Sequence, residues 1–318
     1  MNGGAGNGWA VEIDDLVKTF GDFVAVDHVS LKVPTGEIFG FLGPNGAGKS
    51  TTIRMLCGLL KPTSGRGLVA GIDVAVDPER VRRNIGYMSQ KFSLYDDLTV
   101  EQNIDFFTGM YGVPRELRQA RKDYVLEMAN LTERRDSLTR TLSGGWKQRL
   151  ALGCAILHDP PVVFLDEPTS GVDPIARRVF WDLIGELSRT GHTVFVTTHY
   201  MDEAEYCNRL ALMYAGKVIA LGTPAELKRG MKAHSLLRLD TAEALDTMRA
   251  LEGQEGILDV AVFGSGLHVV VDDVEASMPL IRAALAAKGI EIRRLEPIDP
   301  SLEDVFVALI EAEERKVA

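Results

Sequence analysis

The sequence predicts an α/β fold built on a parallel sheet, followed by a small α+β domain. Short runs of consecutive apolar residues, typical of buried strands, alternate with segments of helical periodicity. Past Gly222 the pattern changes to short strands that accompany two helices. A chain of 318 residues is long enough for one large domain and a small one.

The large domain, residues 10–230, holds the strands and helices of the predicted sheet. Residues 24–33 alternate apolar and polar side chains, as a half-buried strand does. Between residues 100 and 135 the pattern is wholly helical, so we expect a helical subdomain inserted between two strands. The other predicted strands are residues 37–42, 161–165 and 193–198, and the helices are residues 50–60, 147–157 and 175–188.

The small domain, residues 231–318, is predicted to be an accessory α+β domain without an obvious catalytic constellation. At the other end, residues 1–9 are rich in Gly and Asn and lack the basic and apolar regions of a signal peptide. We expect them to be a disordered tail. The predicted strands of the small domain are residues 236–239, 257–263, 267–271 and 290–295, and its helices are residues 242–251 and 277–288.

Composition limits the possible functions. The net charge of -10 argues against a nucleic-acid partner, because broad nucleic-acid binding needs clustered positive charge. No apolar run approaches the roughly 18 residues that would span a bilayer. Cys57, Cys154 and Cys207 lie far apart and form no CxxC pair, so neither a zinc site nor a disulfide framework is predicted.

Residues 43–50, Gly-Pro-Asn-Gly-Ala-Gly-Lys-Ser, match the phosphate-loop pattern GxxxxGK[ST] between a predicted strand and a predicted helix. Glycines let the backbone wrap phosphates, and the start of a helix offers free N–H donors and a positive dipole end. Lys49 is expected to neutralise the outer phosphates and the hydroxyl of Ser50 to bind Mg²⁺. The motif therefore predicts nucleotide binding.

Asp166 and Glu167 follow the apolar strand 161–165. The carboxyl ends of parallel strands form the ligand crevice, so both acids are expected to face the phosphate loop. One acid would anchor Mg²⁺ indirectly, and the other would polarise water for attack on the terminal phosphate. The competing interpretation is a pair of solvated loop charges.

Five further motifs follow in a fixed order and carry a family resemblance. Residues 142–149, Leu-Ser-Gly-Gly-Trp-Lys-Gln-Arg, resemble the signature LSGGQ of ATP-binding cassette (ABC) ATPases. Phe20 matches the aromatic residue that stacks on adenine, and Gln90 matches the Q-loop glutamine. Residues 170–173 match the D-loop and His199 matches the switch histidine. The resemblance extends from about residue 11 to residue 227.

The resemblance implies an ABC fold of the P-loop NTPase class, with a mixed sheet core, an antiparallel β subdomain and an inserted helical subdomain. It also implies that two copies pair head to tail around ATP and Mg²⁺, each ATP lying between one copy's phosphate loop and the other copy's signature. Ser143, Gly144 and Gly145 begin a helix whose N-terminus would contact the γ-phosphate across the interface.

The resemblance assigns a role to each matching residue. Glu167 is expected to be the catalytic base or to orient water, and His199 to hold the γ-phosphate. Lys49 and Gln90 complete the catalytic set, and Asp173 communicates across the dimer. The ATP-binding residues are expected to be Phe20, Gly43, Pro44, Asn45, Gly46, Ala47, Gly48, Lys49, Ser50 and Thr51, and the metal residues Ser50, Gln90 and Asp166.

Trp146 departs from the family, which has glutamine at that position of the signature. Because the phosphate contacts lie in the three preceding residues, we expect ATP sandwiching to survive. Two interpretations of Trp146 stay open: a contact to the nucleotide sugar or the opposite subunit, or packing at the dimer edge.

Residues 301–306, Ser-Leu-Glu-Asp-Val-Phe, resemble an element of drug and lipid exporter ATPases whose permease is a separate chain. The resemblance therefore implies an export ATPase held at the cytoplasmic face of the membrane by that permease. In the family, the neighbourhood of residues 91–95 receives the permease's coupling helix, whereas core packing of Phe92 and Tyr95 is the competing interpretation. The C-terminal domain is expected to stabilise the dimer or to dock onto the permease.

Alternatives to an exporter are an importer ATPase and a non-transport cassette ATPase. A chromosome-type cassette protein would carry a long heptad insertion before the signature, and residues 90–143 are too few for one. A translation-factor cassette protein would hold two cassettes, and the sequence shows one.

Overall fold

The computed structural model describes residues 8–90, 94–230, 235–264 and 266–317. The chain divides into two compact units, residues 1–224 and residues 225–318, which are described separately below. Most of the tail expected at residues 1–9 lies outside the described residues. The expectation of disorder is wrong for Trp9, which begins a strand because its backbone pairs with Pro34.

A mixed sheet forms the centre of the first unit. In the described residues its strand order is β10-β9-β3-β8-β7-β6, and β10 is antiparallel to β9 whereas the other neighbours are parallel. Strands β3, β7 and β8 are buried along their whole length, which explains their continuous apolar sequences. The strands are β3 (Ile38–Leu42), β6 (Ile85–Met88), β7 (Val162–Asp166), β8 (Thr193–Thr198), β9 (Arg209–Tyr214) and β10 (Lys217–Gly222).

An antiparallel sheet of order β2-β1-β4-β5 packs against the same core. Its long hairpin turns at Gly21, where φ is 58°, and joins strands whose outermost pair is Phe20 and Phe23. Between this sheet and the mixed sheet, apolar side chains such as Leu16, Phe41 and Ile53 form one buried cluster. The elements are β1 (Trp9–Phe20), β2 (Phe23–Pro34), α1 (Lys49–Leu56), β4 (Ser64–Val69), β5 (Ile72–Asp73) and α2 (Pro78–Arg83).

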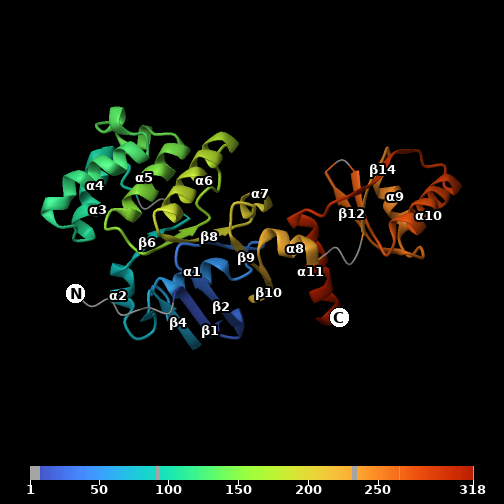
Figure 1. Cartoon of the computed structure of the whole chain (residues 1–318), viewed down its shortest axis with the longest axis horizontal. Helices are drawn as coiled ribbons and strands as arrows, with labels where there is room; N and C mark the ends of the chain where they lie inside the picture. Colours follow the sequence, from blue (N-terminus) through green and yellow to red (C-terminus); the bar gives the residue numbers. More distant parts are fainter. Residues whose placement is uncertain (1–7, 91–93, 231–234, 265, 318) are drawn as a thin grey trace. The chain divides into compact units, whose positions relative to one another are not determined.

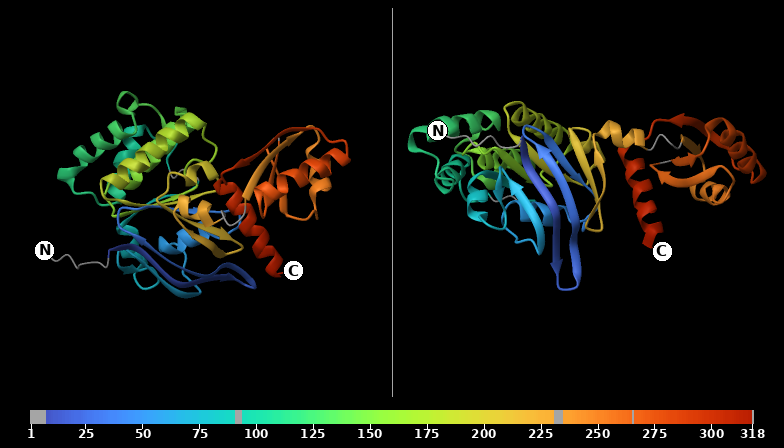
Figure 2. Two further views of the ribbon diagram at one scale, coloured as in Figure 1. Left: turned by 45° about the vertical axis from the view of Figure 1, so that its right-hand side comes forward. Right: turned by 60° about the horizontal axis from the view of Figure 1, so that its bottom comes forward.

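The predicted helical insertion has its own core. A capping box of Thr99 and Gln102 starts α3, and helix α4 packs so closely on α5 that a Cβ atom on Gly153 would lie 2.4 Å from Val125. Helices α3 to α6 lie on the opposite side of the mixed sheet from β1, β2 and β4 (Figures 1 and 2). The elements are α3 (Val100–Met110), α4 (Arg115–Met128), η1 (Thr132–Arg134), η2 (Thr139–Thr141), α5 (Gly144–Ile156), α6 (Pro174–Arg189) and α7 (Met201–Ala204).

The second unit contains a four-stranded antiparallel sheet within its described residues, of order β12-β13-β11-β14. The chain order β-α-β-β-α-β with this arrangement is a ferredoxin-like topology. Alternate strand residues such as Leu237 and Val269 form a core with Ile281 and Leu285 from α10. The elements are α8 (Pro224–Gly230), β11 (Ser235–Thr241), α9 (Ala244–Leu251), β12 (Ile257–Phe263), β13 (Gly266–Val271), α10 (Val274–Ala287), β14 (Ile292–Ile298) and α11 (Leu302–Val317).

The exporter-like motif at residues 301–306 forms the start of α11. Asp304 accepts hydrogen bonds from the backbone N–H and the hydroxyl of Ser301, and Ser301 Oγ accepts one from the Asp304 N–H. The other Asp304 oxygen lies 2.5 Å from Nδ1 of His268, whose ring stacks on Phe263. Within the second unit, these contacts anchor the last helix to strand β13.

The predicted fold class is confirmed, and several boundaries differ. The helix expected at residues 50–60 ends at Leu56, because Gly58 has a φ of 64° and a Cβ atom there would meet Pro78. Strands β1, β4, β5, β6, β9 and β10 were not expected from the sequence. Among the described residues, none of the helices combines the length and apolar character that crossing a bilayer requires.

Candidate active site

The phosphate-loop residues connect β3 to α1 by a path that requires glycine. A Cβ atom on Gly43 would lie 2.2 Å from the carbonyl oxygen of Met213, and one on Gly48 would lie 2.5 Å from that of Ala25. Gly48 also has a φ of 102°, and Gly46 one of 83°, which side-chain-bearing residues rarely adopt. The neighbouring strands therefore press on the loop and fix its curvature.

Lys49 is buried inside this loop. Its Nζ donates to the carbonyl oxygens of Gly43 and Pro44 at 2.8 Å and 3.0 Å, and lies 3.5 Å from a carboxylate oxygen of Glu167. Burial lowers the pKa of the Lys49 ammonium below its ordinary value, while the Glu167 carboxylate partly restores it. The Lys49 ammonium has lost its water shell, and the Glu167 carboxylate compensates only part of that loss. It therefore strongly attracts an anion that enters the loop.

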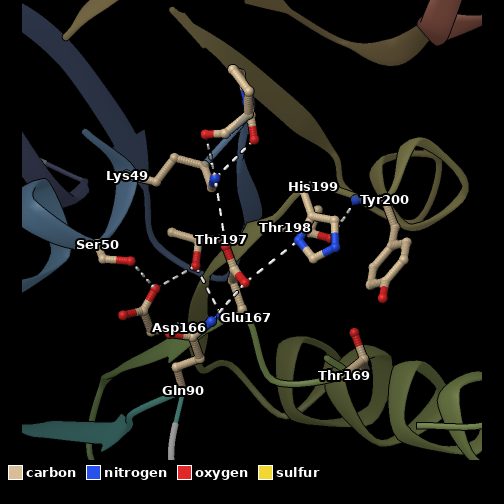
Figure 3. A network of polar contacts seen from close by, with 12 residues as sticks. Lys49, Ser50, Gln90, Asp166, Glu167, Thr169, Thr197, Thr198, His199 and Tyr200 are labelled. Carbon is tan, nitrogen blue, oxygen red and sulfur yellow. Dashed lines mark hydrogen bonds and ion pairs between the residues drawn. The ribbon is translucent and has the colours of Figure 1, made fainter. Parts of the chain in front are cut away.

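Asp166 ends β7 beside the first turn of α1. The hydroxyls of Ser50 and Thr197 both donate to its Oδ1, at 2.8 Å and 2.7 Å. Thr197 Oγ1 in turn accepts a hydrogen bond from the Glu167 N–H at 2.9 Å, so three separate segments meet at one carboxylate (Figure 3). Thr197 was not predicted, although a polar residue late in the apolar run 193–198 is the signal that marks it.

Glu167 is the centre of the remaining polar contacts. Gln90 Nε2 donates to Glu167 Oε2 at 3.0 Å, and His199 Nδ1 lies 3.5 Å from the same oxygen (Figure 3). Glu167 has a φ of 47°. A non-glycine residue in the left-handed region costs about 1–3 kcal/mol, and such strain concentrates at functional sites. The buried Nδ1 of His199 has no hydrogen-bond partner in the described part of the chain.

The donor set around Asp166 fits Mg²⁺. This ion prefers oxygen ligands and usually takes one or two from protein and the rest from phosphate and water. The Ser50 hydroxyl and the Asp166 carboxylate supply such oxygens within 2.8 Å of each other. Gln90, also predicted as a metal residue, instead donates its amide to Glu167.

The signature residues lie apart from this cluster. Ser143 precedes α5 and is exposed, and the described residues show no hydrogen bond or ion pair between it and the phosphate loop of the same chain. Gly145 is buried against α6, where an added Cβ atom would lie 2.7 Å from that of Ala176. Further along α5, Gln148 donates to the carbonyl oxygen of Pro168, which links the signature helix to the loop after Glu167.

Trp146 packs within its own helical subdomain. Its partly buried ring belongs to the edge of the α3–α4–α5 cluster, and the guanidinium of Arg134 lies 3.8 Å from the ring centroid. Arg149 is a second cation at 6.0 Å. These contacts give Trp146 a local packing role that does not require a second copy.

Two further predicted residues contact neighbours that lie close to them in the sequence. Phe20, at the end of β1, is 50% exposed and pairs across the hairpin with Phe23, which is 63% exposed. Phe23, the first residue of β2, was not among the predicted residues. Asp173 caps α6 by accepting from the N–H groups of Ile175 and Ala176.

A phosphate loop that faces paired acids at the carboxyl edge of a parallel sheet defines a nucleotide-binding domain of the P-loop class. Residues 26–170 match the family described as ABC transporter. Residues 222–310 match the family described as ATP-binding protein DrrA1-3-like, C-terminal domain.

Proteins with similar sequences are ATP-binding proteins of the same class. The chain is 54% identical over 218 residues to the probable multidrug ABC transporter ATP-binding protein YbhF of Escherichia coli (strain K12), which covers 69% of this chain but only 38% of that protein. It is 38% identical over 304 residues to the daunorubicin/doxorubicin resistance ATP-binding protein DrrA of Streptomyces peucetius, covering 94% of this chain and 92% of the relative.

A solved structure is similar as well. An ATP-binding cassette in a dimeric post-hydrolysis state, bound to ADP and Pi, matches with a TM-score of 0.61 and 29% identity, over 67% of this chain and 98% of that one. The chain therefore belongs to the ATP-binding proteins of ABC transporters, in the group that carries a DrrA-like C-terminal domain.

Proposed function

We propose that this chain binds ATP with Mg²⁺, hydrolyses it between two copies of itself, and thereby drives export through a separate membrane permease. The proposal rests on the separation of the predicted phosphate-contacting residues into two groups within one chain. Lys49, Asp166 and Glu167 converge in one chain, while Ser143 at the start of α5 is exposed and shares none of their hydrogen bonds or ion pairs within the described residues.

The residues in place account for the chemistry of hydrolysis. Entry of the β- and γ-phosphates would replace the Gly43 and Pro44 carbonyl oxygens as partners of Lys49. Bound Mg²⁺, held by Ser50 and Asp166, would neutralise phosphate charge. Glu167 lies where it can accept a proton from the attacking water, and Gln90 and His199 flank the same carboxylate oxygen and so limit its orientation.

A second copy supplies what one chain lacks. Two residues after Asp173, Ile175 is 80% exposed at the start of α6, where a second copy could cover it. Free N–H groups at the start of α5, together with the Ser143 hydroxyl, form a donor set for a γ-phosphate held by the partner. The dimeric relative bound to ADP and Pi supports this pairing.

A trapped dimer tests the proposal. Glu167→Gln should abolish steady-state ATPase activity, because an amide cannot accept the proton, while it retains ATP binding and yields an ATP-dependent dimer in size-exclusion chromatography. Glu186→Gln, an exposed change on α6, is the matched control and should behave as wild type. Normal turnover by Glu167→Gln would remove Glu167 from its proposed role.

For the permease, we propose docking at a groove of the first unit. A cavity of about 790 Å³ lies between the β6 edge and α3, lined by Leu59, Tyr87, Tyr95, Phe106 and Met110 among others. Tyr95, Phe106 and Met110 are 48%, 43% and 55% exposed, so Tyr95 is not a core residue. A groove with aromatic walls and with Glu79, Arg82 and Arg83 also in its lining suits a short amphipathic segment of the permease. Residues 91–93, predicted to take part, lie outside the described residues.

Two substitutions distinguish this groove from other exposed apolar positions. Phe106→Ala combined with Met110→Ala should reduce co-purification of the permease with the ATPase from membranes. Leu117→Ala, at an exposed position of α4, should leave the recovery of the permease unchanged. Equal recovery of permease by all three proteins would exclude the groove.

Export of a drug or lipid-like substrate is supported by the two relatives described as multidrug and daunorubicin/doxorubicin resistance proteins. The DrrA-like match at residues 222–310 favours this role over that of an importer ATPase. We place the chain at the cytoplasmic face of the membrane, held by its permease. The C-terminal domain, residues 231–318, is proposed to stabilise the dimer or the assembly with the permease, and deletion of these residues should weaken one of the two.

A further inference from the structure

One buried carboxylate near the site has no part in the chemistry described above. Glu203, in the short helix α7, is 0% exposed and lies four residues after His199. A buried charge must be neutralised by hydrogen bonds or an opposite charge. The hydroxyl of Thr169 donates to Glu203 Oε1, the hydroxyl of Thr198 donates to Oε2 at 2.5 Å, and Arg177 Nε lies 3.4 Å from Oε1.

These partners come from two loops that carry site residues. Thr169 lies between Glu167 and Asp173, and Thr198 immediately precedes His199. Thr198 Oγ1 also accepts the N–H of Tyr200 at 3.0 Å, so the backbone is held on both sides of His199. Figure 3 shows Thr198 at the end of β8, followed by His199 and Tyr200, with Thr169 on the neighbouring loop.

Arg177 extends the same network to α6. Its backbone N–H makes the ordinary first-turn helical bond to the carbonyl oxygen of Asp173 at 2.9 Å, so it is the side chain of Arg177 that joins α6 to Glu203. Its guanidinium lies 4.1 Å from the ring centroid of Tyr200. The loop that ends at Asp173 and the loop that carries His199 therefore share one buried set of polar contacts.

We propose that Glu203 is a positioning residue that holds His199 in register with the loop from Glu167 to Asp173. A carboxylate accepts one hydroxyl on each oxygen here, so displacement of either loop would leave a buried polar group without its partner. Rearrangement at Asp173, where the second copy is proposed to bind, is thereby transmitted to His199. This inference rests on the proposed function, because it assumes that His199 acts in ATP hydrolysis and that Asp173 lies where the second copy binds.

A purely structural role of the network is the competing explanation. Thr169→Val preserves side-chain shape and removes the hydroxyl, whereas Thr169→Ser retains the hydroxyl. Thr108→Val is the matched control, because Thr108 is 1% exposed and donates to the Ile104 carbonyl oxygen at 2.6 Å in the helical subdomain, away from the site. It should destabilise the chain by a comparable loss of one buried hydrogen bond.

The experiment measures kcat and KM for ATP and the unfolding midpoint of the full-length chain. Thr169→Val and Glu203→Gln should lower kcat by about tenfold or more with KM within about twofold, because small displacements of reacting groups are costly. Thr169→Ser and Thr108→Val should keep kcat within about twofold of wild type. Wild-type kcat in Thr169→Val, or an equal kcat loss in Thr108→Val at matched stability, would overturn the proposal.

Glu167→Gln, measured in the same series, distinguishes failure of the proposed ATPase function from failure of the positioning role of Glu203. If it turns over ATP normally, the proposed function fails. If it is inactive while Thr169→Val and Glu203→Gln are normal, only the positioning role fails.

Discussion

The two units of the chain bury polar groups in different ways. In the first unit, Lys49, Asp166 and Glu167 come from distant parts of the sequence and converge at the ends of strands. In the second unit, buried polar side chains pair within the domain core, as His268 does with Asp304 and Thr241 with Thr247. The residues of the first unit are held at a cost in free energy, because Lys49 is desolvated and Glu167 has a strained backbone.

This difference teaches how to separate a site from a scaffold. Buried polar residues that satisfy one another locally stabilise a fold, and they need no ligand. Buried groups held at some cost, beside a loop whose path requires glycine, indicate that a ligand completes them. The predictions below test this distinction, from the largest expected effect to the smallest.

Loss of the buried ammonium should be the most damaging change. Lys49→Ala is expected to weaken ATP binding by about 10- to 150-fold, since a charge-assisted contact in a desolvated loop contributes roughly 1.5–3 kcal/mol. Isothermal titration with ATP and Mg²⁺ measures this. Lys61→Ala, which removes an exposed cation of the same unit, should bind normally. Full-strength ATP binding by Lys49→Ala would contradict the assignment of the loop.

The buried pair in the second unit should affect stability and not turnover. Asp304→Asn is expected to destabilise the domain by about 1–3 kcal/mol, because it disturbs the contact to His268 and the start of α11. Denaturant unfolding measures the loss, with exposed Glu255→Gln as the control. ATPase activity per folded molecule should change by less than about twofold. A large loss of turnover at full folding would show that the two units are not distinct in this respect.

A pH effect on stability is the smallest expected effect. Hydrogen bonds from Arg135 and Lys122 lower the pKa of Glu101 from 4.5 to about 2. Its stabilisation is therefore present above the ordinary pKa and is lost as pH falls through the folded-state value. The Tm difference between wild type and Glu101→Gln should be constant above about pH 5 and should narrow as the pH falls from about 5 towards about 2, the window between the unfolded and folded pKa values of Glu101.

Exposed Glu127→Gln, in the same subdomain, is the control for this pH series. Its Tm should follow that of wild type throughout. A Tm difference for Glu101→Gln that is constant with pH would show that the Arg135 and Lys122 contacts do not stabilise the ionised form selectively.

Much of the site could be predicted because its residues follow short motifs at strand ends. The phosphate loop, Asp166 and His199 all occupy such positions, and the structure brings the loop, the acids and His199 together. What the motifs could not show were contacts between distant segments. Thr197 at Asp166, Ala176 against Gly145, and Arg134 on Trp146 become neighbours only through the tertiary fold.

The missed strand β1 has a similar explanation. Its pairing with β2 shifts register between Ile13 and Leu16, where Asp15 has a φ of 51°. Such a bulge breaks the two-residue alternation by which half-buried strands are recognised in a sequence. Strand β1 was therefore missed, although it pairs with both β2 and β4.

The most direct measurement of the central claim uses the chain's own cysteine chemistry. Cys57, Cys154 and Cys207 are buried, and burial raises the pKa of each thiol, so the native cysteines should resist oxidation. Asn45→Cys and Ser143→Cys place new thiols at exposed positions of the phosphate loop and the signature. Each is introduced into a separate Glu167→Gln chain, and the two chains are mixed.

If ATP is clamped between two copies, oxidation of the mixture should give a disulfide-linked species of twice the chain mass when ATP and Mg²⁺ are present and not when they are absent. Non-reducing electrophoresis measures it, and each chain with one introduced cysteine, oxidised alone, controls for other pairings. A mixture that stays monomeric with ATP bound, or that cross-links equally without ATP, would contradict the account.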